Sequence, residues 1–99
     1  MSSLSVILPN YNHSDLLETA CNAIFSQSIA PLEVIIIDDA STDKSLEIIK
    51  SLQKRYPLIK IIQNKKNLGP VRTINKGIKE AQGTYLAFCS ADENDEGSE

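Results

Sequence analysis

The chain has 99 residues, of which 41% are hydrophobic, and its formal net charge is −3 at pH 7. This length is enough for one domain with its own core and excludes a second domain of ordinary size. The chain has no block of basic residues, which excludes a large nucleic-acid surface, and no apolar run long enough to cross a membrane. The first nine residues lack the basic start and long apolar region of a signal peptide.

The first predicted strand covers residues 4–8, which are nearly all apolar. We expect Pro9 to end this strand, because proline cannot donate a hydrogen bond to a sheet. A polar loop follows, and apolar residues then recur at helical spacing. They predict a helix over residues 15–27, with Asn12 or Ser14 as its N-cap.

The second predicted strand covers residues 34–37, where four β-branched apolar residues stand in a row. Such a run is typical of a strand buried on both faces in a parallel sheet. The run stops at two adjacent carboxylates, Asp38 and Asp39, at the carboxyl end of the strand, where open α/β sheets bind ligands. Two like charges side by side cost stability unless a cation, a hydrogen-bond donor or water compensates them, so this pair predicts a binding partner.

The helix after the acid pair is predicted over residues 43–55, with Ser41 or Thr42 as its N-cap. The third strand is predicted over residues 59–63. It carries Lys60 among isoleucines, and a charged residue in a strand indicates a position near the edge of the sheet.

A loop rich in Asn and Lys follows at residues 64–69. Pro70 suits the first position of the third helix, where its missing N–H is not needed. The fourth strand is predicted over residues 85–89. We expect a single domain over residues 1–93 and a short acidic, disordered tail over residues 94–99.

The two cysteines, Cys21 and Cys89, fall within a predicted helix and a predicted strand. Their separation does not match the spacing of a metal site. We therefore expect two buried free thiols in a reducing compartment, which places the protein in the cytoplasm.

Strands that alternate with helices predict an α/β fold with right-handed crossovers and a parallel sheet. The expected architecture is a three-layer α/β/α, doubly wound, Rossmann-like domain with strand order 3-2-1-4. In this topology the loops that follow all four strands lie on one rim of the sheet. The strand order reverses between the first and fourth strands, and a ligand crevice is expected there.

The residue types on this rim suggest what the crevice binds. Tyr11 offers a flat face for a base. Asp39 can accept a hydrogen bond from a ring N–H, which favours uracil. Asp92, together with Glu93, offers oxygen ligands to Mg²⁺ or Mn²⁺, which would bridge to a diphosphate. The chain contains neither Gly-x-Gly-x-x-Gly nor Gly-x-x-x-x-Gly-Lys, which disfavours a dinucleotide site and a P-loop.

Four segments also carry a family resemblance. The chain resembles the N-terminal, nucleotide-binding half of glycosyltransferase family 2 enzymes with the GT-A fold. The match covers nearly the whole chain, because the segments occur in the family's order at its usual spacing. The matching segments are Ser5–Asn12, Ile37–Asp43, Asn67–Gly69 with Asn75–Ile78, and Gly83–Phe88 with Ser90–Asp92.

The resemblance implies that the chain binds a nucleotide-diphosphate sugar, with UDP-sugar as the favoured donor. By that resemblance, Tyr11 and Asp39 hold the base, while Pro9 and Asn12 shape the loop around it. The residues implied to bind the donor are Pro9, Tyr11, Asn12, Asp38, Asp39, Gly69 and Asp92.

The resemblance also implies a divalent metal, Mg²⁺ or Mn²⁺. Asp92 matches the last acid of the family's Asp-x-Asp motif and would coordinate the cation. Ser90 stands where the first acid of that motif often lies. This departure weakens the expected sugar and metal contacts on that side.

Family members are similar to one another over a long further segment. That segment supplies the acceptor site and the catalytic base, which deprotonates an acceptor hydroxyl for inverting displacement at the anomeric carbon. We therefore expect this chain to be the donor-binding half alone, from an engineered truncation or a curtailed gene product. The acceptor, a saccharide or a lipid carrier, and any place at the cytoplasmic face of the membrane would belong to the missing part.

Two other functions are consistent with parts of the pattern. A non-catalytic nucleotide-binding or self-association module would form a homodimer through the exposed edge of the strand at residues 85–89. A phospho-acceptor receiver domain is also doubly wound with an acid pair. In receivers, however, the acids follow the first strand, whereas here that strand ends in Pro9–Asn12.

Overall fold

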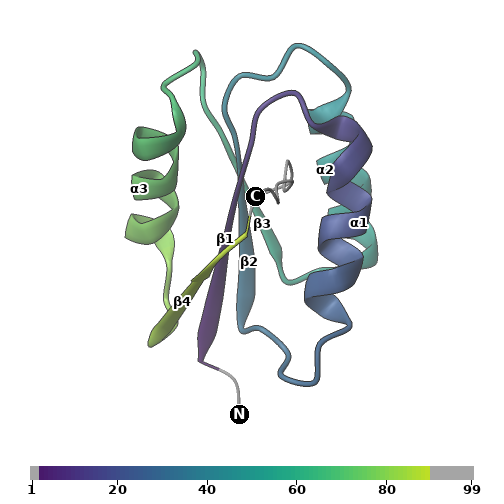
Figure 1. The fold of residues 1–99 in the computed structure, drawn as a ribbon, viewed down its shortest axis with the longest axis vertical. Coiled ribbons are helices and arrows are strands. Elements are labelled where there is room, and N and C mark those ends of the chain that lie inside the picture. Colours follow the sequence, from purple (N-terminus) through teal and green to yellow (C-terminus); the bar gives the residue numbers. More distant parts are fainter. Residues whose placement is uncertain (1–2, 90–99) are drawn as a thin grey trace, which may run out of the picture.

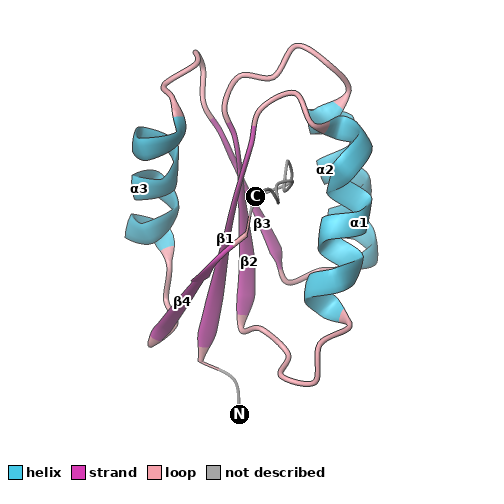
Figure 2. Ribbon diagram, viewed as in Figure 1, coloured by secondary structure: helices cyan, strands magenta, loops and turns pink. Residues whose placement is uncertain are grey.

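The computed structural model describes residues 3–89 of the chain. Its elements alternate strand and helix, as predicted (Figure 1, Figure 2). No helix within these residues is long and apolar enough to cross a membrane. In chain order the elements are β1 (Leu4–Asn10), α1 (Ser14–Phe25), β2 (Glu33–Asp38), α2 (Ser45–Arg55), β3 (Ile59–Gln63), α3 (Pro70–Glu80) and β4 (Tyr85–Phe88).

The strands form one parallel sheet in the order β3-β2-β1-β4, which confirms the predicted order 3-2-1-4. Helices α1 and α2 cover one face of the sheet, and α3 covers the other (Figure 1). The chain therefore switches faces between β3 and β4, and the predicted three-layer, doubly wound α/β class is confirmed.

The core has two parts because successive side chains of a strand point to opposite faces of the sheet. On β2, Val34 and Ile36 pack in the larger cluster beneath α1 and α2, while Ile35 and Ile37 pack on the face covered by α3. All four side chains are fully buried, and burying each contributes about 1.5–3 kcal/mol. The continuous apolar run in the sequence reflects this burial on both faces.

The first strand continues through Pro9, so the prediction that Pro9 ends it is wrong. In a parallel strand, the backbone groups of successive residues point alternately to the two neighbouring strands. The C=O of Ile7 accepts a hydrogen bond from Cys89 on the β4 side at 3.0 Å, and the C=O of Asn10 accepts one from the residue after β2 at 2.9 Å. Pro9 therefore faces the β4 side, and β1 continues past it through its pairing with β2, where Asn10 lies opposite Asp38.

The first two helices begin without the predicted side-chain caps. Their N-cap residues are His13 and Lys44, and neither side chain makes a capping hydrogen bond. The Asp43 carboxylate instead accepts hydrogen bonds from the N–H of Ser14 at 3.1 Å and the N–H of Ser45 at 2.8 Å. One carboxylate therefore serves the start of both helices, and the caps predicted from the sequence are wrong: Asn12, Ser14, Ser41 and Thr42.

The two edges of the sheet are β3 and β4, so the edge position predicted from Lys60 is confirmed. The Lys60 ammonium donates to Glu33 Oε1 at 2.6 Å. The other oxygen of Glu33 accepts hydrogen bonds from the Ser5 hydroxyl and the Gln82 N–H, each at 2.6 Å. Glu33 thereby ties β1, β3 and the connection before β4 to the start of β2.

Cys21 and Cys89 form no disulfide, and Cys21 is buried while Cys89 is half-buried. Burial, followed by the nearby Cys89, raises the pKa of the Cys21 thiol to about 11, against the opposing effect of Arg55. Cys21 therefore stays protonated at neutral pH and packs as a small apolar side chain.

Candidate functional site

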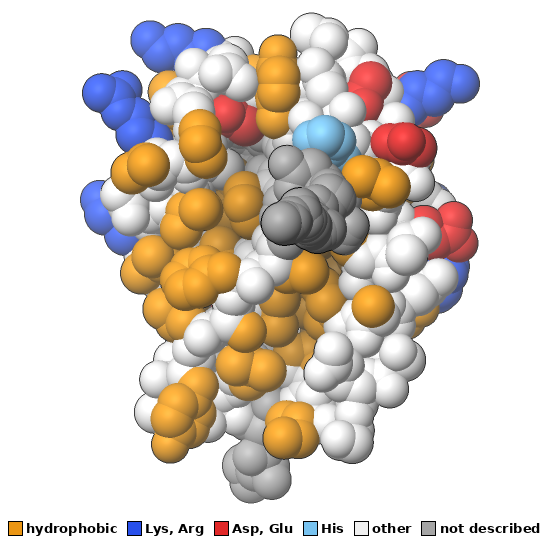
Figure 3. Space-filling view, in the orientation of Figure 1, with side chains coloured by type: hydrophobic (Ala, Val, Ile, Leu, Met, Phe, Trp, Pro, Cys, Tyr) orange, Lys and Arg blue, Asp and Glu red, His pale blue; other side chains and the backbone are white. Residues whose placement is uncertain are grey.

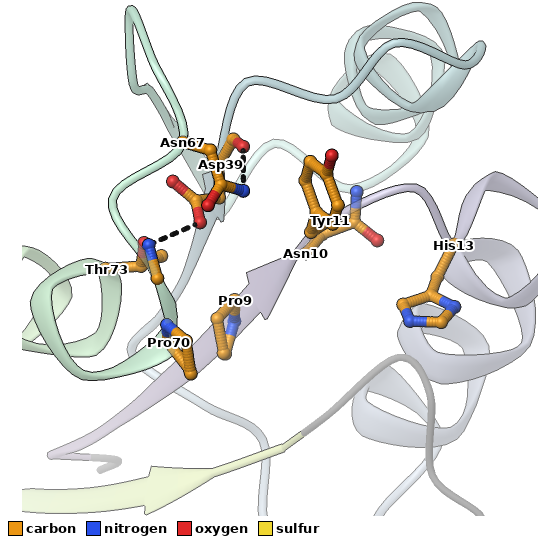
Figure 4. A pocket seen from close by; sticks show the side chains of 9 residues that line it. Pro9, Asn10, Tyr11, His13, Asp39, Asn67, Pro70 and Thr73 are labelled. Atoms are coloured by element: carbon orange, nitrogen blue, oxygen red, sulfur yellow. Dashed lines mark hydrogen bonds between the residues drawn. The ribbon is translucent and has the colours of Figure 1, made fainter.

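A cavity of about 320 Å³ opens at the rim where the strands end, between the loop after β1 and the start of α3 (Figure 4). Parallel strands place their carboxyl ends on one side of the sheet, which is why loops distant in sequence meet here. The cavity is lined by Pro9, Asn10, Tyr11, His13, Asp39, Asn67, Gly69, Pro70 and Thr73.

Four of the residues predicted to bind the donor line this cavity, namely Pro9, Tyr11, Asp39 and Gly69. Asn12 and Asp38 lie close by in sequence but are not among its lining residues. The predictions for Asp92 and Ser90 and for the tail at residues 94–99 fall outside the described residues.

The Asp39 carboxylate lies on the wall of the cavity and is held by three N–H groups. Its Oδ1 accepts hydrogen bonds from the N–H of Leu68 at 2.7 Å and from Asn64 Nδ2 at 2.9 Å. Its Oδ2 accepts one from the N–H of Gly69 at 3.0 Å. Burial alone would raise the pKa of Asp39, but these hydrogen bonds outweigh it and lower the pKa. Asp39 is therefore an ionised acceptor at neutral pH.

Asp38 has a different role from its neighbour because it points to the other face of the sheet. It is 1% exposed, and its Oδ1 accepts hydrogen bonds from the Ser41 hydroxyl at 2.6 Å and Asn10 Nδ2 at 3.1 Å. Its Oδ2 accepts one from the Ser41 N–H at 3.0 Å. Asp38 thus holds the turn after β2 and joins it to the end of β1. This also explains why the Ser41 hydroxyl does not cap α2.

Asn12 shapes the rim without lining the cavity. Its φ of 57° lies in the left-handed region, which asparagine adopts more readily than most residues. Its Oδ1 accepts hydrogen bonds from the N–H of Thr42 at 2.8 Å and the N–H of Asp43 at 3.2 Å. Asn12 therefore fixes the loop after β1 against the loop after β2, and these bonds keep its side chain from capping α1.

A flat aromatic ring and a glycine are also part of the lining of the cavity. Tyr11 is 45% exposed, so its ring face is available to a ligand. Gly69 is the N-cap of α3 with a φ of 89°, where a residue with a side chain would be strained. In Figure 4 the side chain of Pro9 lies on β1 between Tyr11 and Pro70, the first residue of α3.

Sequence reasoning missed five lining residues. Two of them, Asn10 and His13, stand beside predicted ones at the end of β1 and in the loop after it. Asn67, whose Nδ2 donates to the Asp39 C=O at 3.3 Å, stands in a segment that already carried the resemblance. Thr73 is four residues after Gly69, one turn into α3, and this helical spacing could have indicated it.

Within residues 3–89, no group of three or more His, Cys, Asp or Glu side chains could hold a metal ion. Asp39 is also unsuited to a cation, because N–H donors already surround its carboxylate. The predicted Mg²⁺ or Mn²⁺ site therefore depends on Asp92, which lies outside the described residues.

Comparison with known proteins gives a consistent result. Residues 5–97 match the family model described as glycosyl transferase family 2. The chain is 40% identical over 92 residues to the uncharacterized glycosyltransferase YibD of Escherichia coli, covering 93% of this chain and 26% of that protein.

Solved structures share the fold. The mannosyltransferase PcManGT from Pyrobaculum calidifontis, in complex with GDP-Man and Mn²⁺, is similar with a TM-score of 0.84 and 26% identity over 91% of this chain and 27% of its own. Staphylococcus aureus TarS 1-349, in complex with UDP-GlcNAc, is similar with a TM-score of 0.80 and 33% identity over 93% of this chain and 27% of its own. The chain thus spans about a quarter of the length of these proteins.

Proposed function

Because the chain belongs to glycosyl transferase family 2, we propose that its rim cavity binds the nucleotide part of a nucleotide-diphosphate sugar, with UDP-sugar as the favoured donor. The observation that carries this proposal is the buried, ionised Asp39 carboxylate on the wall of a cavity that the exposed Tyr11 ring also lines. An acceptor beside an aromatic face suits a flat base with a ring N–H.

The acceptor chemistry of Asp39 limits which bases fit. Uracil presents a ring N–H between two carbonyl groups, and guanine presents a ring N–H beside an amino group. Cytosine presents an unprotonated ring nitrogen at the corresponding position, so two acceptors would face each other. The donors of the similar structures, UDP-GlcNAc and GDP-Man, both carry a base with a ring N–H.

The charge at the start of α3 orients the ligand. The Asp39 carboxylate accepts from Leu68 and Gly69, immediately before the first helical residue Pro70, and so offsets the positive end of the helix. A diphosphate at that point would meet the negative charge of Asp39. The base therefore occupies the Asp39 end, and the diphosphate extends along the rim away from it.

We assign the divalent cation, Mg²⁺ or Mn²⁺, to Asp92, because PcManGT binds Mn²⁺ together with GDP-Man. The cation would neutralise the diphosphate. The described side chains bind and orient the donor, and the whole protein would transfer the sugar with inversion to an acceptor held elsewhere. Cysteines without a disulfide, at positions 21 and 89, fit a cytoplasmic location.

The test is a titration of ¹⁵N-labelled protein with UDP, GDP and CDP, with and without Mg²⁺. We expect UDP to move the amide signals of Tyr11, Asp39 and Gly69, and CDP to bind at least about tenfold more weakly because it lacks the ring N–H. Tyr11→Ala should weaken binding, whereas Tyr85→Ala, at an exposed tyrosine of β4, should not. Saturating UDP and GDP that shift no amide of a folded sample would refute the proposal.

A second function, self-association, is supported by one specific observation. Tyr85, Leu86 and Phe88 on the edge strand β4 are 66%, 39% and 57% exposed, and hydrophobic side chains gather over this part of the molecule in Figure 3. An unprotected apolar edge can pair with another strand. We therefore also propose a homodimer through β4.

A further inference from the structure

The buried side chain of Asn64 contacts Asp39 from behind the cavity wall. Asn64 directly follows β3, is 1% exposed and is not among the residues that line the cavity. Its Nδ2 donates to Asp39 Oδ1 at 2.9 Å and to Thr73 Oγ1 at 3.1 Å. Its Oδ1 accepts a hydrogen bond from the Lys76 ammonium at 2.9 Å. Every polar atom of this side chain is therefore engaged.

The direction of the Asn64 amide is set by its neighbours on α3. An ammonium group donates hydrogen bonds and cannot accept them, so Lys76 requires the amide oxygen to face it. The amide nitrogen must then face Asp39 and Thr73. Both Thr73 and Lys76 belong to α3, so the position of the helix is linked to the orientation of the carboxylate.

The Asp39 carboxylate is held from several sides. Its Oδ1 accepts from the N–H of Leu68 and from Asn64 Nδ2, and its Oδ2 accepts from the N–H of Gly69, which lines the cavity. A side-chain hydrogen bond from Thr73 also lowers the pKa of Asp39. Asn64 therefore fixes Oδ1, and with it the direction in which the carboxylate faces the cavity.

We propose that Asn64 is a positioning residue for donor recognition: held by Lys76 and Thr73, it binds Asp39 Oδ1 and so orients the carboxylate that accepts the ring N–H of the base. This inference rests on the proposed function of the cavity. Asn64 acts through Asp39 and does not touch the nucleotide.

The first measurement needs no ligand. Carbon-13 NMR of the side-chain carboxyls follows Asp39 separately from the other titratable groups near it, which are Asp38, Tyr11, His13 and Lys76. Removing a donor from the charged form of a carboxyl raises its pKa. Asn64→Ala should therefore raise the pKa of Asp39, whereas Gln63→Ala, which deletes an exposed amide next in sequence, should leave it unchanged.

The second measurement is the UDP dissociation constant as a function of pH. We expect Asn64→Ala to bind UDP about tenfold more weakly at neutral pH. Its loss of binding on acidification should also begin at a higher pH than in the wild type. A role confined to fold stability would lower the melting temperature without moving this pH. An unchanged pH profile in a variant whose affinity has fallen would overturn the inference.

A gentler variant covers the case in which Asn64→Ala does not fold. Lys76→Met removes the ammonium that orients the amide and leaves the buried side chain in place. It should shift the pH profile in the same direction, and Lys79→Met, an exposed lysine of the same helix, should not. Failure of wild-type protein to bind UDP or GDP would refute the proposed function, while the pKa of Asp39 in the variants would still decide the role of Asn64.

Discussion

Two identical residues that follow each other in the chain have separate roles because a strand alternates its side chains. The Asp38 side chain points to the α1–α2 face, and its carboxylate accepts hydrogen bonds from neighbouring parts of the rim, Asn10 and Ser41. Asp39 points toward α3 and reaches the cavity. The like charges are therefore compensated by separate sets of donors, and no shared cation is required to explain the pair.

The pKa values of three carboxyls predict instability in acid. Asp39, Asp43 and Glu33 each have a pKa lowered by hydrogen bonds that outweigh the opposing effect of burial. A carboxyl with a lower pKa in the folded protein contributes stability above its unfolded value, about 4, and this contribution is lost as pH falls through the folded value. Urea unfolding between pH 7 and pH 2 should show a free energy of unfolding that falls steadily below about pH 4.

Asp43→Asn tests this explanation at a single residue. The variant should lose stability at pH 7, because the Asp43 carboxylate accepts hydrogen bonds at the start of both α1 and α2. Its free energy of unfolding should also fall less between pH 7 and pH 2 than that of the wild type. Asp15→Asn, at an exposed carboxylate in the first turn of α1, is the matched control. If the free energy of unfolding fell by the same amount on acidification in Asp43→Asn and in the wild type, this account would be contradicted.

At the scale of elements, α3 combines three functions in eleven residues. Its start receives the Asp39 bonds, its first turns supply Thr73 and Lys76 to Asn64, and Gly77 packs directly on the sheet. A small residue at this contact lets the helix approach closely enough for the hydrogen bonds at its start to form. The packing of α3 and the geometry of the site are therefore coupled.

Gly77→Ala tests this close approach. An added Cβ would lie 2.7 Å from Ile37 Cδ1 and 2.8 Å from Ile7 Cγ2, so the helix or both side chains must move. Overpacking costs about 1–3 kcal/mol, and alanine in a helix recovers up to about 1 kcal/mol. We expect a net loss of about 1 kcal/mol by urea unfolding, together with weaker UDP binding. Asn75→Ala, at an exposed position of α3, should be neutral or stabilising, and a stabilised Gly77→Ala would show that the contact is looser than described.

A second prediction at the scale of elements concerns the contribution of Glu33, which lies away from the cavity, to the stability of the fold. It is 2% exposed and joins three segments to the start of β2. Glu33→Gln should lower the free energy of unfolding by about 1–3 kcal/mol, because one amide hydrogen atom must face an existing donor. Glu18→Gln is the comparison, because its ion pair with Arg55 is exposed to solvent and should contribute little to stability. Equal effects of the two substitutions would contradict the role given to Glu33.

At the scale of the whole molecule, the two edges of the sheet differ. The β3 edge carries Lys60, whose charge protects it from pairing, whereas β4 has exposed apolar side chains on a strand without a charged residue. No described residue of β4 lines the cavity, so the proposed self-association and the proposed donor binding involve different residues.

Sedimentation velocity over a range of concentrations tests the dimer. We expect the wild type to dimerise, and Phe88→Lys to shift it to monomer, because a lysine on an edge strand opposes pairing. Leu58→Lys, at an exposed leucine between α2 and β3, should dimerise like the wild type. A wild-type monomer at all concentrations would exclude the dimer.

The sequence by itself determined the order and type of the elements, the strand order and the family. These features follow from local chemistry. The sequence contains runs of β-branched residues, apolar residues at helical spacing and prolines near the ends of elements, and each of these patterns can be recognised without the fold. The sequence also indicated that Pro9, Tyr11, Asp39 and Gly69 belong to one rim, because loops after parallel strands share it.

Only the tertiary structure decided which hydrogen-bond donor pairs with which acceptor. The Asp43 carboxylate serves the starts of α1 and α2, β1 continues past Pro9 through its pairing with β2, and Asp39 is oriented by Asn64 and α3. Each of these outcomes depends on hydrogen bonds between residues distant in sequence. Local patterns show which residues can donate or accept, whereas the fold determines which of the available partners comes within reach.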